Sequence, residues 1–324
     1  IRNIEKEFLK CALNENVSKF SIDPSRVKPR KVKRGGKVTI EAILSFSTKV
    51  GRGESVIRLT SEKENNGNYK CWSILTSLSS MKGSYDLNPK KVEKIKDFKA
   101  PNWLDIRNFE QAYTDKQPTV LVVGSGQAGL SIAARLKQLN IETLIIEKNE
   151  RIGDNWRNRY HSLTLHNQTH VNHLPYMPFP ETWPTYIPKD KLAGWFEYYA
   201  ESMELNVWKN TEFIEADYDE TKKIWAVKTE IGKEKIKYLY PKHIVMAVGV
   251  SSIPQMPNIK GLDNFSGKIL HSAEHSSGKQ FKNKNILVFG TGTSAHDVSQ
   301  DLYANDANVT MVQRSPTMIV NLEP

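Results

Sequence analysis

The chain has 324 residues, enough for two or three domains, and its 39% hydrophobic and 25% charged content is ordinary for a folded globular protein. No apolar run approaches the roughly 20 residues that span a bilayer, and no secretory signal is visible, so we expect a cytoplasmic protein without a transmembrane segment. The two cysteines, Cys11 and Cys71, form no C-x-x-C pair. This favours free thiols in a reducing compartment and excludes a cysteine-based metal cluster.

The formal net charge of +10 comes from the first hundred residues. Residues 1–100 contain 22 Lys and Arg against 11 Asp and Glu, a balance of +11, whereas the remaining 224 residues contain 24 against 25, a balance of −1. The basic residues are densest in residues 26–37, which we interpret as a solvated loop. The alternative is a surface for nucleic acid or anionic lipid, but we expect no nucleic-acid partner.

The first hundred residues predict a small antiparallel region. We expect a short helix within residues 1–20 and then a meander of three strands separated by turn-forming residues. The three strands are placed at residues 38–46, 56–60 and 69–78. Residues 81–118 are polar and contain three prolines, so we interpret them as a linker. Its expected aromatic anchors are Trp103, Phe109 and Tyr113.

The stretch from Thr119 to Glu147 predicts a βαβ dinucleotide-binding unit. An apolar run through Val123 is typical of a buried parallel strand, and glycines follow it at once in G-x-G-x-x-G spacing. The fingerprint residues, which we expect to bind a cofactor, are Gly124, Ser125, Gly126, Gln127, Ala128 and Gly129. These glycines allow a tight turn and close approach to a pyrophosphate, and the following helix N-terminus favours phosphate. The second strand ends on Glu147, whose carboxylate can accept hydrogen bonds from ribose hydroxyls.

A long loop follows Glu147 and runs to Pro180, and loops of this length are uncommon unless they are functional. Its histidine spacings fit no standard zinc pattern, so we predict no metal site. These histidines are His161, His166, His170 and His173. The rest of this region predicts one helix with an apolar stripe, a hairpin and two more strands, the last of them buried. We place these elements at residues 189–203, 213–218 with 224–229, 235–240 and 244–249.

A second unit of the same kind begins with an apolar run at residues 285–289, which we also interpret as a buried strand. Its fingerprint residues are Gly290, Thr291, Gly292, Thr293, Ser294 and Ala295, with alanine allowed at the third position. The first fingerprint begins 23 positions before Glu147, and the same step from Gly290 reaches Gln313, followed by Arg314 and Ser315. The missing carboxylate removes repulsion against a ribose 2′-phosphate, and Arg314 adds a guanidinium that can bind it, as in NADP, although a plain surface arginine is the alternative.

Two dinucleotide units in one chain imply electron transfer between two cofactors. The carboxylate of the first site suits the unphosphorylated ribose of FAD or NAD. FAD with NADPH is the economical pair, because nicotinamide donates the hydride that flavin accepts.

The motifs from about residue 103 to residue 324 resemble those of the flavin-containing monooxygenases, particularly fungal and bacterial forms with an extra N-terminal domain. Gly153-Asp154-Asn155-Trp156 is similar to the family's G-G-x-W, with Asp154 in place of the second glycine. Ala247-Val248-Gly249 begins a stretch similar to the family's A-T-G…P…P…G crossover. Residues 174–180 look like the family's proline-rich turn near the flavin, and residues 265–275 look like its identifying sequence.

One departure, one looser likeness and one alternative family accompany this resemblance. His275 stands where the identifying sequence has an aromatic residue, which leaves Baeyer–Villiger oxidation of ketones open. The meander before Lys82 is similar to the C-terminal half of the cone-shaped α+β fold of nuclear transport factor two. A flavin disulfide reductase shares the double fingerprint but needs a redox cysteine pair, and Cys11 and Cys71 both precede the first fingerprint.

The resemblance implies an NADPH- and FAD-dependent monooxygenase. Reduced flavin would take dioxygen, form a flavin hydroperoxide and transfer one oxygen atom to the sulfur, nitrogen or carbonyl carbon of a small organic substrate. The family's asparagine beside the flavin is placed at Asn167, with a structural asparagine as the alternative. The further cofactor contacts that we expect are Lys148, Asn155, Trp156, His166, Ala247 and Gly249.

The predicted fold class is α/β, with two Rossmann-type dinucleotide-binding units, the second incomplete, preceded by a small partial α+β meander. The expected domains are 1–82 (cone-fold-like), 83–118 (linker), 119–253 (incomplete FAD-binding domain) and 254–324 (incomplete NADPH-binding domain). Because the chain stops just after the second strand of the second unit, the alternative function is a truncated, inactive FAD/NAD(P)-binding remnant. The expected partners are a small-molecule substrate and dioxygen, and the sequence leaves a homodimer open.

Overall fold

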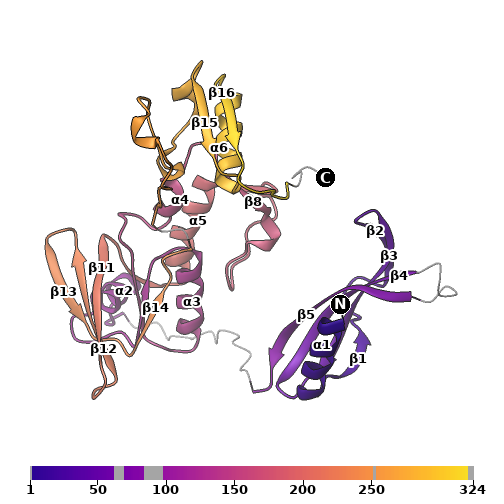
Figure 1. Ribbon diagram of the computed structural model, residues 1–324. Coiled ribbons are helices and arrows are strands. Elements are labelled where there is room, and N and C mark those ends of the chain that lie inside the picture. The colour runs from indigo at the N-terminus through magenta and orange to yellow at the C-terminus, as the bar shows by residue number, and fades with distance from the viewer. Residues whose placement is uncertain (1, 62–68, 84–97, 251–252, 320–324) are drawn as a thin grey trace. The chain divides into compact units, whose positions relative to one another are not determined.

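The computed structural model describes residues 2–61, 69–83, 98–250 and 253–319, and the chain forms two compact units, Ile1–Asn88 and Pro89–Pro324 (Figure 1). Unit 1 contains an antiparallel sheet, and unit 2 contains the parallel sheets of the two dinucleotide-binding units. The predicted fold class is therefore confirmed. In the segments that the structure describes, no helix is long and apolar enough to cross a bilayer.

Unit 1 consists of a helix and a five-stranded antiparallel sheet. Helix α1 spans Arg2–Asn14. The strands are β1 (Ser18–Ile22), β2 (Arg30–Arg34), β3 (Lys37–Ser47), β4 (Gly51–Ser61) and β5 (Tyr69–Met81). Strand β3 pairs with β1, β2 and β4, and β4 pairs with β5. The predicted meander is thus confirmed in β3, β4 and β5.

The predicted helix within residues 1–20 is confirmed as α1, which ends at Asn14 and is followed by β1. The prediction of a solvated loop at residues 26–37 was wrong. Residues 26–37 are not merely a loop, because they contain β2, which pairs with β3 across a turn at Gly35 and Gly36. Basic side chains lie on both faces of β2, so this strand lacks the alternation of apolar and polar residues that identifies a half-buried strand.

Glu41 on β3 shows how the sheet accommodates these basic side chains. Glu41 is 9% exposed, and its carboxylate accepts hydrogen bonds from Arg30 Nη2 on β2 at 3.2 Å and from Arg58 Nε on β4 at 2.8 Å. The hydrogen bond from Arg58 is the main reason that the pKa of Glu41 lies below its usual value. A row of opposite charges across three strands therefore stabilises this part of the sheet.

Unit 2 is organised around a four-stranded parallel sheet in the order β10-β7-β6-β14. These strands are β6 (Val120–Val123), β7 (Thr143–Ile146), β10 (Asn206–Trp208) and β14 (His243–Met246). All residues of β6 and β7 are buried, as their apolar runs predict. The prediction of a buried strand at residues 244–249 was wrong, because β14 is an edge strand with incompletely covered faces, and Met246 is 56% exposed.

Each face of this sheet packs against a different layer. Helices α3 (Gln127–Gln138) and α5 (Lys189–Ser202) contribute Leu130, Phe196 and Tyr199 to the core on one face. The other face packs against an antiparallel sheet in the order β11-β12-β13. Its strands are β11 (Thr211–Asp219), β12 (Ile224–Ile231) and β13 (Lys235–Leu239), which confirms the predicted hairpin and its third strand.

A helix lies within the predicted linker. Helix α2 (Trp103–Ala112) begins with a capping box between Asn102 and Asp105, a signal that the sequence interpretation missed. Tyr113 follows it, is 2% exposed and donates a hydrogen bond to the backbone oxygen of Thr143, so its predicted anchoring role is confirmed. Phe109 is 60% exposed and does not anchor the segment.

The predicted long loop after Glu147 contains three short elements, and a fourth follows it before α5. They are α4 (Asp154–Arg157), β8 (Thr164–Gln168), η1 (Thr169–Val171) and β9 (Tyr186–Pro188). Strands β8 and β9 pair with each other in an antiparallel ribbon. The loop is therefore a structured region that precedes α5.

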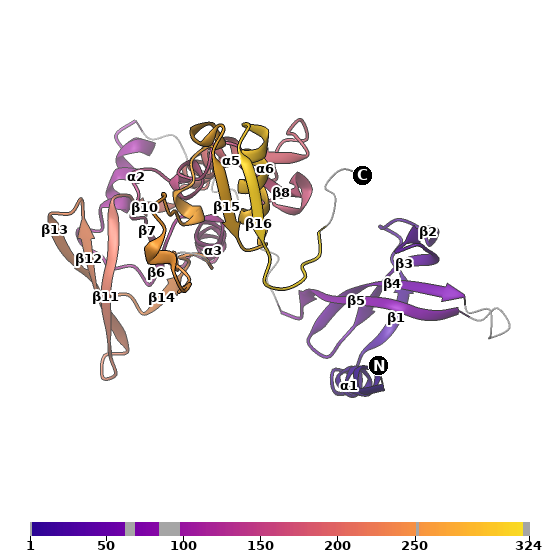
Figure 2. The same cartoon turned by 45° about the horizontal axis from the view of Figure 1, so that its top comes forward.

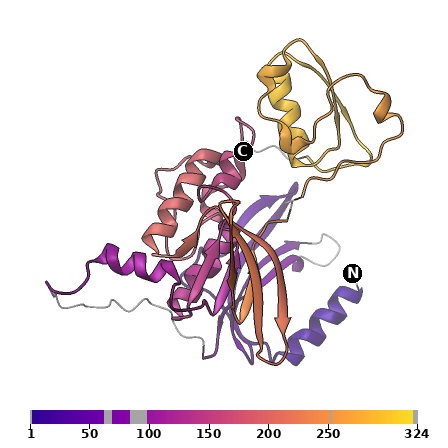
Figure 3. The ribbon, with the colours of Figure 1, turned by 90° about the vertical axis from the view of Figure 1, so that its left-hand side faces the viewer.

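The second dinucleotide unit has two parallel strands and one long helix. These are β15 (Asn285–Phe289), α6 (Thr293–Ala304) and β16 (Asn308–Val312), preceded by the short helices η2 (Leu262–Asn264), η3 (Ser272–Glu274) and η4 (Gly278–Phe281). Figures 2 and 3 show α6 against one face of the two strands, where Val298 and Leu302 are buried. Leu287 and Phe289 are about half exposed on the other face, so the prediction of a buried strand was wrong: α6 covers only one face.

Candidate functional site

The two fingerprints fold into the same turn. Gly124 and Gly290 have φ values of +103° and +109°, a region that favours glycine, and each donates its backbone N–H to the last residue of the neighbouring strand. Gly126 and Gly292, the N-caps of α3 and α6, both have φ −74° and extended ψ values. The sequence repeat is therefore a structural repeat, with a strand, a turn and a helix N-terminus in each copy.

Close packing makes the first turn specific for glycine. A Cβ at Gly129 would overlap the backbone oxygen of Gly124, because α3 lies directly on the end of β6. A Cβ at Gly124 would lie 2.7 Å from the backbone oxygen of Ala247, just beyond β14. The predicted contact residue Ala247 thus lies beside the fingerprint, and Gly249 follows it with φ +84°.

The N-terminus of α3 is free to hold an anion. Across the described ranges, no side chain caps this helix end, so its first N–H groups keep their hydrogen-bonding capacity. Asn155 Nδ2 lies 3.5 Å from the position of a Cβ at Gly126, and Trp156 Nε1 donates to Gln127 Oε1 at 3.3 Å. The predicted contact residues Asn155 and Trp156 therefore border the turn.

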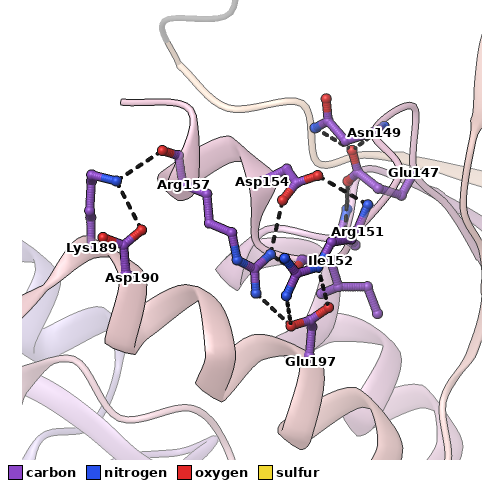
Figure 4. A network of polar contacts seen from close by, with 10 residues as sticks. Glu147, Asn149, Arg151, Ile152, Asp154, Arg157, Lys189, Asp190 and Glu197 are labelled. Atoms are coloured by element: carbon purple, nitrogen blue, oxygen red, sulfur yellow. Dashed lines mark hydrogen bonds and ion pairs between the residues drawn. The ribbon is translucent and has the colours of Figure 1, made fainter. Parts of the chain in front are cut away.

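A charged network holds the segment that carries these two residues (Figure 4). Asp154 accepts from the backbone N–H of Arg151 at 3.1 Å and from Arg157 Nη1 at 2.9 Å. Glu197 on α5 accepts from both arginines, at 3.0 Å from Arg151 Nη2 and 2.5 Å from Arg157 Nη2. The structure thus gives Asp154, which departs from the family's glycine, a role in fixing α4 to α5.

Glu147 is 7% exposed and lies at the end of β7, beside the first turn. Its Oε2 accepts from the backbone N–H and the hydroxyl of Ser125 at 2.9 and 2.7 Å. Its Oε1 accepts from the backbone N–H and side-chain amide of Asn149 at 3.0 and 2.8 Å. Four donors match the roughly four lone-pair positions of a carboxylate, so a ribose hydroxyl would have to displace a side-chain donor.

A cavity of about 330 Å³ opens beside the start of α3. Its walls include Gln127 and Ser131 from α3, Leu165 from β8, His173 from the following loop and Phe196 from α5. The walls are mainly apolar with a few polar groups, which is typical of a site for an organic ligand.

The second turn is more open. A Cβ at Gly290 or Gly292 would meet no atom within 4 Å, and among the described residues no side chain caps α6. Beyond β16, Gln313 Nε2 donates to the backbone oxygen of Ser315 at 2.8 Å, and the Arg314 side chain is exposed. Gln313 occupies the position that corresponds to Glu147, so no carboxylate repels a phosphate on the ribose there, and the exposed guanidinium of Arg314 follows it.

Asp297 on α6 connects the second unit to β8 and the chain before it. Its Oδ2 accepts a hydrogen bond from the Tyr160 hydroxyl at 2.5 Å and lies 2.9 Å from His166 Nε2. Burial, helped by the hydrogen bond to Asp297, raises the pKa of Tyr160, so the hydroxyl keeps its proton and acts as the donor. His166, expected as a cofactor contact, thus contacts α6.

Asp301, one helical turn further, makes a second set of contacts. Its Oδ2 lies 2.8 Å from His275 Nε2 and accepts from the backbone N–H of Gly278 at 2.7 Å. His275 is 7% exposed, so in this chain the residue that replaces the family's aromatic side chain is buried and hydrogen-bonded.

Other predicted residues lie outside these contacts. Asn167 on β8 is exposed and is not among the residues that line the cavity; its backbone oxygen accepts from Asn172. Lys148 is also exposed. Asp297 and Asp301 were not predicted as site residues, although their spacing of four residues on a predicted helix places them on one face. Over the ranges described, no group of three or more His, Cys, Asp or Glu could hold a metal ion.

Comparisons with known proteins agree with this architecture. Residues 121–321 match the profile of the pyridine nucleotide-disulphide oxidoreductase family. The probable indole-3-pyruvate monooxygenase YUCCA3 of Arabidopsis thaliana is 35% identical over 209 residues, which are 63% of this chain and 48% of that protein. The chain therefore spans about half the length of this curated relative.

Solved structures show the same fold. The flavin-containing monooxygenase from Stenotrophomonas maltophilia aligns with a TM-score of 0.58 at 20% identity, covering 63% of this chain and 60% of that one. OTEMO in complex with FAD and NADP aligns with a TM-score of 0.52 at 24% identity, covering 61% of this chain and 39% of that one. The profile match, which covers more than half of the chain, and the repeated turn show that the chain belongs to the pyridine nucleotide-disulphide oxidoreductase family.

Proposed function

We propose that the protein is an NADPH- and FAD-dependent monooxygenase that inserts one oxygen atom from dioxygen into a small organic substrate. The observation that carries this proposal is the repeated turn, which is followed by Glu147 in one copy and by Arg314 in the other. Two equivalent phosphate-binding turns, one followed by a carboxylate and the other by a glutamine and an arginine, suit two different dinucleotides.

The first turn fits FAD. The uncapped N-terminus of α3 would hold the pyrophosphate, and the absence of a side chain at Gly126 leaves the approach open next to Asn155. Glu147 would bind the ribose after the Ser125 hydroxyl or the Asn149 amide rotates away from its carboxylate. We also propose that the remaining predicted contacts, including Lys148, bind a cofactor.

The second turn fits NADPH. The open N-terminus of α6 would hold its pyrophosphate, with Thr291, Thr293 and Ser294 around the turn. Arg314 would form paired hydrogen bonds with the 2′-phosphate, and Ser315 lies next to it in the chain. When bound, NADPH supplies a hydride and FAD supplies the oxygen chemistry.

The chain's own residues would position and shield these groups. The network around Glu197 holds Asn155 and Trp156 at the first turn, and the apolar cavity walls would exclude water from a bound ligand. Asn167 stays a proposed catalytic residue. Within this proposal, residues 119–253 form the FAD-binding part and residues 254–324 the NADPH-binding part, and the protein acts in the cytoplasm.

The test is anaerobic reduction of the FAD-loaded chain, followed by oxygenation assays with a thioether and a cyclic ketone. We expect NADPH to reduce the flavin faster than NADH, and the preferred product then distinguishes oxygenation at a heteroatom from Baeyer–Villiger oxidation. A chain that binds both cofactors but transfers no hydride would instead support the inactive remnant and contradict the proposed activity.

A further inference from the structure

Helix α6 carries the second turn at its N-terminus and two carboxylates further along. Asp297 and Asp301 lie one turn apart, and each contacts a histidine from a different segment of unit 2. Asp297 lies five residues after the N-cap Gly292, which is about 7.5 Å along the helix axis because each residue adds about 1.5 Å. It is therefore too far along the helix to belong to the phosphate-binding turn.

The contacts of Asp297 lead toward the first turn. Tyr160 is 4% exposed, and its hydroxyl and the His166 ring converge on the same oxygen of Asp297. His166 lies on β8 beside Leu165, which lines the cavity next to α3. One carboxylate oxygen thus joins the helix of the second unit to the strand that borders the cavity of the first.

Asp301 contacts a different part of the chain. Asp301 holds His275 and Gly278, which both precede β15 within the second unit. This segment contacts the first unit through a backbone hydrogen bond, from His161 N–H to the oxygen of Ser276 at 2.8 Å, and through the rings of His275 and Tyr160, whose centroids lie 6.2 Å apart. Among the described side chains, Asp297 therefore makes the direct hydrogen bonds between α6 and the segment that ends in β8.

We propose that Asp297 is a positioning residue for hydride transfer, because it sets where α6 and its nucleotide-binding turn lie relative to β8 and the cavity beside the first turn. This inference rests on the proposed function. Hydride transfer requires the reacting atoms to lie within about 3–3.5 Å, and a misplacement of about 1 Å can reduce the rate by about 100-fold. Loss of Asp297 therefore slows reduction of the flavin without removing any phosphate contact.

The first readout is the rate of flavin reduction by NADPH in the complete FAD-loaded chain, with dissociation constants for FAD and NADPH measured separately. Asp297→Ala lowers the reduction rate by about tenfold or more. Asp297→Asn lowers the rate less, because it keeps one acceptor oxygen. Both variants keep the dissociation constants for FAD and NADPH within about twofold of the wild-type values. Tyr160→Phe removes one of the two donors and gives an intermediate rate. The matched control is Asp306→Asn, whose side chain forms an exposed ion pair with Lys282.

The second readout is amide hydrogen exchange in the cofactor-free chain. Asp297→Ala speeds exchange across residues 160–168, whereas Asp306→Asn leaves it unchanged. Unchanged exchange in this segment for Asp297→Ala overturns the inference, whether or not the chain binds cofactors. A wild-type reduction rate in Asp297→Ala, or a slower rate explained entirely by weaker NADPH binding, also overturns it. By contrast, failure of the wild-type chain to bind FAD refutes the proposed function and leaves the exchange result to decide the role of Asp297.

Discussion

Replacing Gly129 by alanine tests the packing of the first turn in isolation. The new Cβ would overlap the Gly124 oxygen, so α3 must retreat from β6 by about 1 Å before the contact reaches the ordinary lower limit of 3.0 Å. The Cβ would also lie 3.0 Å from the Gly124 carbonyl carbon and 3.3 Å from Val122 Cγ1, a fully buried residue. No flexible side chain can move aside to relieve the overlap.

The magnitude follows from two opposing contributions. Overpacking in a dense core costs about 1–3 kcal/mol or somewhat more, and alanine in a helix recovers up to about 1 kcal/mol relative to glycine. With the overlap directed at backbone, we expect the free energy of unfolding of unit 2 to fall by about 2 kcal/mol. For a unit of this size, this corresponds to a drop in Tm of about 4–8 °C.

Thermal unfolding followed by tryptophan fluorescence measures this effect, because six of the seven tryptophans lie in unit 2. The matched control is Gly194→Ala inside α5, where a Cβ would meet no atom within 4 Å. That variant should be as stable as the wild type or gain up to about 1 kcal/mol. A Gly129→Ala protein as stable as this control would refute the close approach of α3 and β6.

Three other perturbations address the charged groups. Glu197→Ala removes an acceptor from Arg157 and should weaken FAD binding several-fold and lower the Tm. Glu201→Ala, one helical turn further and exposed, should change neither. Equal effects of the two substitutions would contradict the role of the network. Arg314→Ala should weaken NADPH binding by about tenfold or more and leave NADH binding unchanged, because hydrogen bonds to charged groups contribute about 1.5–3 kcal/mol. An equal loss of affinity for both nucleotides would refute the assignment of Arg314 to the 2′-phosphate. The lowered pKa of Glu41 means that its stabilisation of unit 1 is complete above the ordinary carboxyl pKa of about 4.3 and is lost as pH falls through the lowered value. Unfolding of unit 1, monitored between about pH 6 and pH 3, should therefore be less pH-dependent in Glu41→Gln, and an unchanged pH profile would show that Glu41 is not the group responsible.

The sequence predicted the features that depend on local pattern. The turn at Gly124 is legible because a buried strand, a glycine spacing and a helix start follow one another within a few residues, and the same holds at Gly290. The hairpin of β11 and β12 is legible for a similar reason, since its alternation and its turn lie within one short stretch.

Structural features that depend on residues distant in the sequence could not be predicted. Asp297 and Tyr160 are 137 positions apart, and neither residue carries a local signal of their hydrogen bond. Strand β2 was missed because its stabilising carboxylate, Glu41, lies on the next strand rather than in the basic run itself. The exposure of β14 and β15 could not be predicted either, because an apolar run shows that a strand can be buried and does not show what covers it.

The central claim is that one chain holds two different dinucleotides in two copies of the same turn. The most direct measurement is a flavin-fluorescence titration of the 324-residue chain with FAD, repeated for Gly126→Trp and Gly292→Trp. We predict saturable quenching for the wild type and for Gly292→Trp, and none for Gly126→Trp, because only Gly126 caps the helix assigned to FAD. Equal binding by both variants, or no binding by a folded wild-type chain, would contradict the assignment.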